Sequence, residues 1–206
     1  MASYTTIQGE SSAEIVEKKS RFIGAAQHVE TEEEALAFLE SIKVEHRMAR
    51  HHVYAYVLRS GRVRYSDDGE PQKTAGLPTL DVINHAGLTD IIVVTTRYFG
   101  GTLLGTGGLV RAYTQAAQQA IEAARKVTMS PCVEALVRIA YPYYKQAARL
   151  VEHYEHAKMI TADFAAEVVL RILILEGFEE YLKQELDELT SAQVVFEVVK
   201  SYEAPF

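Results

Sequence analysis

The chain of 206 residues has a single cysteine, Cys132, and therefore cannot form a disulfide within itself. It has no apolar run near the roughly 18 residues that a membrane-spanning helix needs. Its N-terminal segment lacks the basic stretch and apolar core of a secretion signal. Together these absences predict a cytoplasmic protein with no membrane partner.

The composition is ordinary for a globular protein, with 48% hydrophobic and 24% charged residues. The net charge of −7 is unevenly distributed. Residues 1–128 contain 14 Lys and Arg against 15 Asp and Glu, whereas residues 129–206 contain 7 against 13. Because phosphate contacts dominate the affinity for nucleic acid, the acidic second part is a poor candidate for binding it non-specifically.

Short strands and helices are predicted along the first 128 residues. Thr31 precedes three glutamates, which suits the start of a helix. The apolar and β-branched run Ile91–Thr96 is typical of a buried strand. The remaining patterns predict strands over 13–18, 21–29, 53–58 and 63–66, and helices over 78–86 and 109–126.

A break at Val127–Pro131 is predicted to divide the chain into domains 1–128 and 129–206. Beyond it the patterns predict a strand at 134–141, a helix at 144–156, strands at 159–165 and 167–175, a helix at 177–190 and a strand at 193–202. This β-α-β-β-α-β order is that of a ferredoxin-like domain. The predicted fold class is therefore α+β.

A glycine-rich turn joins the strand that ends near Arg97 to the following helix. Five of the nine residues 100–108 are glycine, and a turn between a strand and a helix is a common phosphate site. Val110 replaces the third glycine of the dinucleotide fingerprint, and Thr106 and Gly107 stand where the Walker motif has Lys and Ser or Thr. These departures exclude a dinucleotide or nucleoside-triphosphate site, and leave a packing turn and an anion-binding turn as alternatives.

Arg111 falls in the first turn of the predicted helix, where a cation opposes the helix dipole. Such an arginine needs a compensating anion, either a bound phosphate or the carboxylates of the acidic turn 67–70. Arg97, at the end of the preceding strand, is a candidate for the same place.

Metal and thiol chemistry are not favoured by the sequence. Asp67, Asp68 and Glu70 are suitable Mg²⁺ ligands, but the EF-hand pattern is absent and Asp-Gly is a turn signal in its own right. His51 and His52 are neighbours before a strand, so their side chains are expected to face opposite ways and not to share a metal. We expect no metal, no cofactor and no catalytic cysteine.

Several blocks in order resemble the YigZ/IMPACT family of small translation-associated proteins. They are Ser20-Arg21-Phe22-Ile23, Ala49-Arg50-His51-His52, Tyr54-Ala55-Tyr56, Ser66-Asp67-Asp68-Gly69-Glu70-Pro71, Thr74-Ala75-Gly76, Arg97-Tyr98-Phe99-Gly100-Gly101 and Arg111-Ala112-Tyr113. The resemblance implies an N-terminal IMPACT domain, an α/β two-layer sandwich like the second domain of a small-subunit ribosomal protein. It also implies a C-terminal ferredoxin-like domain similar to domains of elongation factor G. Lys73 and Val53 depart from the glycine and cysteine that are common in the family at these positions.

The sequence and the resemblance together predict a binding or regulatory protein of the translation apparatus, without enzymatic activity, whose partner is RNA or a ribosomal surface. The predicted anion- or nucleic-acid-binding residues are Arg97, Gly100, Gly101, Gly107, Gly108, Arg111, Arg50 and Lys73. Asp67, Asp68 and Glu70 are expected to hold the arginines when no ligand is bound, with His51 and His52 nearby.

Two alternatives stay open. One is a Mg²⁺-dependent enzyme acting on a phosphorylated small molecule or a phosphodiester, with His51 or His52 as base. The other is a protein–protein interaction module that uses the exposed face of the C-terminal sheet. The oligomeric state is not predicted.

Overall fold

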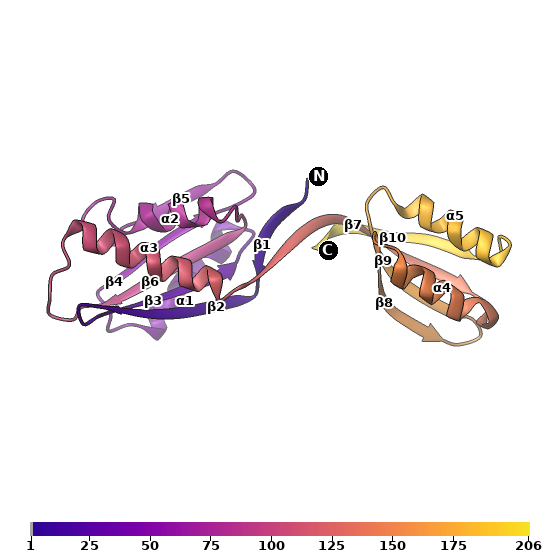
Figure 1. Ribbon diagram of the computed structural model, residues 1–206, viewed down its shortest axis with the longest axis horizontal. Coiled ribbons are helices and arrows are strands. Elements are labelled where there is room, and N and C mark those ends of the chain that lie inside the picture. Colours follow the sequence, from indigo (N-terminus) through magenta and orange to yellow (C-terminus); the bar gives the residue numbers. More distant parts are fainter. Residues whose placement is uncertain (1) are drawn as a thin grey trace. The chain divides into compact units, whose positions relative to one another are not determined.

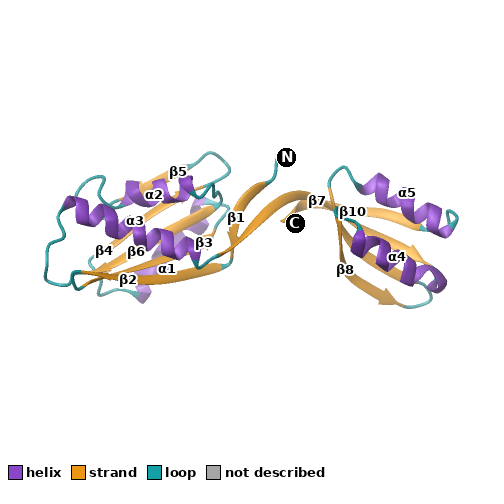
Figure 2. Cartoon of the chain, viewed as in Figure 1, coloured by secondary structure: helices purple, strands orange, loops and turns teal. Residues whose placement is uncertain are grey.

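A computed structural model describes residues 2–206 and shows a mixed α+β protein with two sheets and five helices (Figures 1 and 2). The α+β fold class is confirmed. The chain divides into two compact units, Tyr4–Thr128 and Met129–Phe206, and Ala2 and Ser3 group with the second. None of the described helices is long and apolar enough to cross a membrane.

The first unit is built on a five-stranded sheet with the strand order β2-β3-β6-β4-β5. Neighbouring strands in it are antiparallel. The elements of this unit are β1 (Tyr4–Gln8), β2 (Glu10–Glu17), β3 (Ser20–His28), α1 (Glu32–Glu45), β4 (His51–Val57), β5 (Val63–Ser66), α2 (Gly76–His85), β6 (Ile91–Tyr98) and α3 (Thr106–Glu122).

Helices cover both faces of this sheet (Figure 1). Because side chains alternate along a strand, Ile92 packs in the cluster that contains Phe38 of α1. Val93 packs in the cluster that contains Ile83 of α2 and Ala117 of α3. Burial on both faces explains why β6 has the nearly continuous apolar pattern from which a buried strand was predicted.

The strand register places the first residues of the candidate site. β6 lies between β3 and β4, and Arg97 near its end pairs with Phe22 on one side and His51 on the other. The glycine-rich turn then leads from β6 into α3. The predicted start of α1 is confirmed, since the Thr31 hydroxyl accepts a hydrogen bond from the backbone N–H of Glu34 at 3.1 Å.

The second unit has the predicted β-α-β-β-α-β order. Its elements are β7 (Arg125–Ile139), α4 (Tyr141–His153), β8 (Ala157–Phe164), β9 (Val168–Leu175), α5 (Glu179–Thr190) and β10 (Val195–Pro205). β7 pairs with β9 and β10, and β9 pairs with β8, all antiparallel. Both helices contribute to one apolar cluster with the sheet, including Val151 of α4 and Leu182 of α5.

The domain boundary predicted at Val127–Pro131 falls where the chain divides into its two units, between Thr128 and Met129. The secondary structure has no break there, because β7 runs without interruption through these residues. α3 ends at Glu122 rather than near residue 126. Proline removes only a backbone donor, and the Pro131 carbonyl still accepts a hydrogen bond of 2.9 Å from the N–H of Glu176. The β-branched residues Val127 and Thr128 favour a strand, so one proline does not end it here.

Candidate functional site

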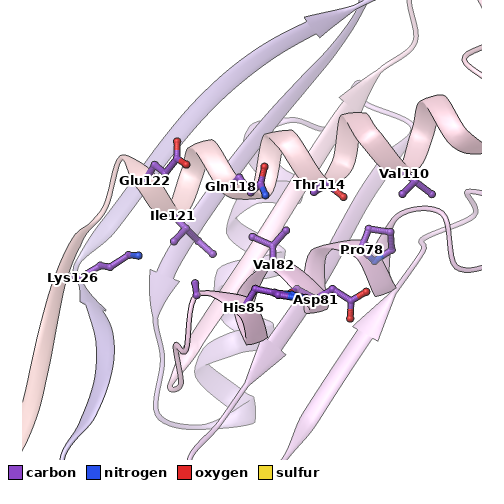
Figure 3. Close-up of a pocket in the computed structure, with 11 residues that line it drawn as sticks. Pro78, Asp81, Val82, His85, Val110, Thr114, Gln118, Ile121, Glu122 and Lys126 are labelled. Atoms are coloured by element: carbon purple, nitrogen blue, oxygen red, sulfur yellow. The ribbon is translucent and has the colours of Figure 1, made fainter.

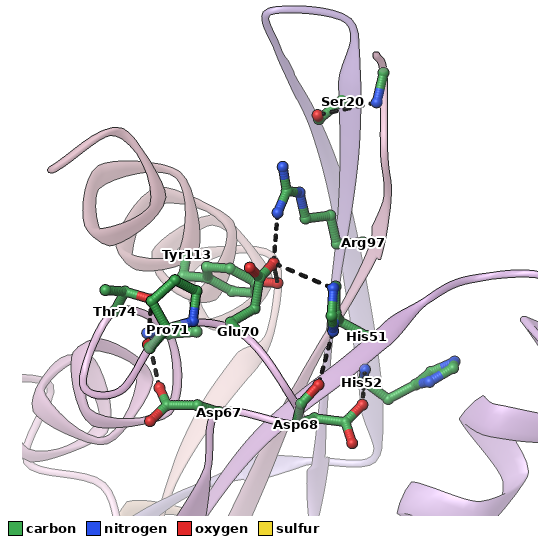
Figure 4. A network of polar contacts seen from close by, with 12 residues as sticks. Ser20, His51, His52, Asp67, Asp68, Glu70, Pro71, Thr74, Arg97 and Tyr113 are labelled. Atoms are coloured by element: carbon green, nitrogen blue, oxygen red, sulfur yellow. Dashed lines mark hydrogen bonds and ion pairs between the residues drawn. The ribbon is translucent and has the colours of Figure 1, made fainter. Parts of the chain in front are cut away.

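Arg97 and Glu70 form a buried ion pair at the end of β6 (Figure 4). Arg97 Nη1 donates to Glu70 Oε1 at 2.6 Å, and the Tyr113 hydroxyl on α3 donates to the same oxygen at 2.8 Å. The side chains of Arg97 and Glu70 are only 7% and 4% exposed. Because a buried charge is costly unless it is paired, this contact fixes the acidic turn against β6 and α3.

Tyr113 remains a hydrogen-bond donor in this network. Burial raises the pKa of its hydroxyl far above the ordinary value, and the neighbouring Glu70 carboxylate raises it further. The hydroxyl therefore keeps its proton and donates a hydrogen bond to the Glu70 carboxylate.

Arg97 has bonding capacity that this pair does not use. Its Nε is buried and has no hydrogen-bond partner among the residues that the structure describes. The guanidinium carbon lies 5.4 Å from the ring centre of Phe22 and 5.6 Å from that of Phe99. An unpaired buried donor costs about 1–3 kcal/mol, so an acceptor that reached this Nε after a shift of the side chains around it would gain a favourable contact.

Asp67 binds backbone amides instead of arginine, which corrects the role expected for it. Its Oδ1 accepts from the N–H groups of Ala75 at 3.0 Å and Gly76 at 2.8 Å, and its Oδ2 accepts from that of Lys73 at 2.9 Å. α2 has no side-chain cap from its own N-cap residue, Ala75. The Asp67 carboxylate supplies that cap from a distant turn, where its negative charge suits the positive end of the helix.

Asp68 likewise has no contact with Arg97 or Arg111. Its Oδ2 accepts from the backbone N–H of His52 at 2.6 Å, and its carbonyl oxygen accepts from His51 Nδ1 at 2.7 Å. Only Glu70 of the three carboxylates reaches an arginine, because the backbone amides of neighbouring segments hold the other two.

These bonds also disfavour the predicted Mg²⁺ alternative. Asp67 and Asp68 would have to leave backbone amides to share a cation with Glu70. Within residues 2–206, no group of three or more His, Cys, Asp and Glu side chains is arranged to hold a metal ion.

The two histidines diverge (Figure 4). The partner of His51 Nδ1 is the carbonyl oxygen of Asp68, which can only accept a hydrogen bond, so Nδ1 carries a proton. The other ring nitrogen, Nε2, lies 4.0 Å from Glu70 Oε1. The His52 ring is buried away from Glu70, and its Nε2 has no partner in the described part of the chain. Burial lowers the pKa of His52, although the charge of Asp68 partly opposes this.

The backbone explains why residues 100 and 101, the first two of the turn, are glycines. A Cβ on Gly100 would overlap the carbonyl group of Lys19, and the Gly100 N–H donates to Ser20 Oγ at 3.1 Å. Gly101 has φ +83°, which side chains rarely allow. This end of the turn is therefore packed tightly on the β2–β3 hairpin.

The second half of the turn forms the N-terminus of α3. Its N-cap is Gly105, which has no capping side chain, and the first helical turn contains no acidic residue. Gly107 and Gly108 lie in that turn, whose N–H groups have no partner within the helix. A Cβ on Gly107 would lie 3.8 Å from Nη1 of Arg111, so the Arg111 side chain lies over the same turn.

Arg111 is exposed and makes no hydrogen bond or ion pair with any described residue, so the expected compensation by the acidic turn is not found. Arg50, just before β4, and Lys73 are also exposed, and no polar contact joins either side chain to Arg97. The structure thus brings Arg97, Glu70 and His51 together and leaves the other three cations in solvent.

Sequence reasoning missed Tyr113 as a member of the network. The residue stands in the Arg111-Ala112-Tyr113 block, but its partner Glu70 is 43 positions away. Only the fold brings the two side chains together.

A separate groove of about 490 Å³ lies between α2 and α3 (Figure 3). Pro78 and Val82 on α2 face Val110 and Ile121 on α3 across it. None of the predicted binding residues lines this groove, so it is distinct from the glycine-rich turn.

The sheet with its glycine-rich turn has counterparts among known proteins. The family described as the Impact N-terminal domain matches residues 18–121. A Haemophilus influenzae protein described as an IMPACT family member is 38% identical over 187 residues, which cover 89% of this chain and 90% of the relative. The IMPACT family member YigZ of Escherichia coli is 39% identical over 161 residues, or 76% and 78% of the two chains.

A solved structure described as that of a hypothetical protein is 32% identical, with a TM-score of 0.63 over 97% of this chain and 98% of its own. These matches define a protein with an Impact N-terminal domain. The chain belongs to the IMPACT family, and the resemblance seen in its sequence is confirmed.

Proposed function

We propose that this chain is a cytoplasmic regulatory binding protein of the translation apparatus, without enzymatic activity, that contacts RNA through its glycine-rich turn, either free or on a ribosomal surface. The observation that carries the proposal is the buried Arg97, whose Nε has no partner among residues 2–206, on the strand that leads into the open N-terminus of α3 and its Arg111. The chain belongs to the IMPACT family, and its resemblance to that family implies a role in translation, which supports the proposed function.

The chemistry of the turn suits phosphate. An uncapped helix N-terminus presents N–H groups and the positive end of a dipole to an anion. Arg111, which lies over that turn and has no polar partner in the described part of the chain, adds a guanidinium whose fork matches phosphate oxygens. In the proposed complex Arg97 and Arg111 bind phosphate, and Gly100, Gly101, Gly107 and Gly108 allow the backbone to approach it. Arg50 and Lys73 add positive charge around it.

Glu70 holds Arg97 in place when no RNA is bound. It is buried and shares one oxygen between Arg97 and Tyr113, so the guanidinium is oriented before the ligand arrives. Preorganisation of this kind improves affinity because less side-chain freedom is lost on binding. We further propose that domain 1–128 carries this activity, since domain 129–206 has 7 basic against 13 acidic residues.

The test is a charge reversal at Arg111, which is exposed and unpaired and whose loss leaves the buried network intact. Arg111→Glu should weaken the binding of a labelled single-stranded RNA, measured by fluorescence anisotropy, about tenfold or more at low salt. Arg149→Glu is the matched control, because Arg149 is also exposed on a helix and has no ion pair among the described residues. Equal affinities for the two variants would contradict the proposal.

A further inference from the structure

The turn between β2 and β3 has an unusual backbone for its residues. Glu17 pairs with Ser20, so the hairpin loop consists of Lys18 and Lys19 alone. Their φ angles are +45° and +67°, in the left-handed region that residues with a side chain rarely adopt. Two-residue hairpin turns of this kind favour Asn-Gly, so two lysines are a costly choice for the fold.

Nothing in the described chain uses the two ammonium groups. Both lysines are exposed, and neither makes an ion pair or a side-chain hydrogen bond with residues 2–206. Arg21 nearby differs, because Glu14 binds it through two hydrogen bonds of 2.9 and 2.8 Å. The two turn lysines are therefore free cations, whereas Arg21 is already neutralised.

This hairpin turn is packed against the glycine-rich turn. The backbone of Lys19 lies so close to Gly100 that no side chain fits there, and Ser20 Oγ accepts the Gly100 N–H. The two free lysines thus flank the turn that follows Arg97, at the same end of the sheet.

Between Arg97 and Gly100 the chain also exposes an aromatic ring. Phe99 is 43% exposed, and the Arg97 guanidinium lies 5.6 Å from its ring centre. Proteins that bind single strands combine cations that follow the backbone with aromatic rings on which bases stack. A duplex would keep its bases stacked away from such a ring.

We propose that Lys18, Lys19 and Phe99 extend the phosphate site into a short track for single-stranded RNA. A base stacks on Phe99, and the two lysines bind phosphates on one side of it. This inference rests on the proposed function, because it takes the glycine-rich turn as the central phosphate contact. It explains a strained Lys-Lys turn that the fold itself does not need.

Two variants separate function from folding. Lys18→Gln/Lys19→Gln removes only the charges, and Lys18→Asn/Lys19→Gly also installs the residues that the turn prefers. Both should bind a labelled single-stranded RNA more weakly, with a slope of log affinity against log salt shallower by about 1.4 for two phosphates. The second variant should nevertheless melt at a higher temperature than the wild type. Phe99→Leu should weaken binding several-fold with little change in that slope.

The control is Lys126→Gln/Lys145→Gln, which removes the same charge from two other exposed lysines. The inference is overturned if Lys18→Gln/Lys19→Gln binds like this control while Arg111→Glu still weakens binding. Wild-type protein that binds no RNA at low salt would overturn the proposed function itself, and this inference with it. Equal loss of affinity in the control would show that only net charge matters, and would also overturn the inference.

Discussion

The Glu70 carboxylate and the Arg97 guanidinium meet at 2.6 Å, and both side chains are more than nine-tenths buried. Through this contact a turn after β5 is tied to the end of β6, and Tyr113 ties α3 to the same oxygen. The pair therefore holds together the three segments that surround the glycine-rich turn. It also places an arginine where a long polar side chain is seldom found.

Glu70→Ala should lower the free energy of unfolding by about 3–5 kcal/mol, because it leaves Arg97 buried without its counter-ion. Tyr113→Phe removes one donor from the same oxygen and should cost only about 1 kcal/mol. Denaturant unfolding of the full chain measures both. If Glu70→Ala were as stable as Tyr113→Phe, the buried pair would not be the main link between these segments.

Lys73→Gly should stabilise the fold by about 0.5–1 kcal/mol. Lys73 has φ +60°, in the left-handed region. This conformation is unfavourable for a residue that has a side chain, but it is nearly neutral for glycine.

The matched control for that change is Lys43→Gly within α1, where φ is helical and glycine should cost about 1 kcal/mol. Thermal melting of the two variants should therefore move in opposite directions. A lower melting temperature for Lys73→Gly would show that the Lys73 side chain stabilises the fold by contacts that outweigh the strain.

The stability of the protein should depend on pH through His52. Burial holds the pKa of His52 below its ordinary value of 6.5 in the fold, so the unfolded chain takes up the proton more readily. The resulting stabilisation is complete above about pH 6.5 and is lost as the pH falls below that value. The charge of Asp68 and a hydrogen bond with the backbone of His46 favour the protonated form and raise the pKa of His52, whereas the charges of Lys43 and His46 oppose that form.

His52→Gln should remove part of this dependence. Unfolding free energies of wild type and variant, measured from pH 7.5 down to pH 5, should converge as the pH falls. Parallel curves would mean that His52 is equally easy to protonate in the folded and unfolded chains.

Much of the fold was predictable because local patterns and global packing agree. Thr31 with its three glutamates fixed the start of α1, and the β-α-β-β-α-β order of the second unit followed from apolar periodicity. The continuous strand through Val127–Pro131 was not predicted, because the sequence pattern was interpreted as a helix that ends near residue 126 and a strand that begins at residue 134. In a strand the carbonyl of Pro131 still pairs, so the flanking β-branched residues decide the outcome.

The candidate site was predictable in its residues but not in its contacts. Arg97, Glu70 and His51 were all named from the sequence. Asp67 and Asp68 were expected to bind arginine. Instead, Asp67 caps the start of α2, and Asp68 accepts a hydrogen bond from a backbone N–H of β4. A carboxylate in a turn has several N–H groups within reach, and their positions depend on how distant segments pack. The contact between Tyr113 and Glu70 was not predicted for the same reason, since it also depends on the packing of distant segments.

Binding of RNA by this chain can be measured by co-sedimentation of the wild-type protein with ribosomes and with purified ribosomal RNA across salt concentrations of about 50–200 mM. We expect binding at low salt whose affinity falls steeply and linearly with salt on logarithmic axes, because phosphate contacts release counter-ions. No binding at low salt, or binding that salt leaves unchanged, would contradict an RNA-binding role for the glycine-rich turn.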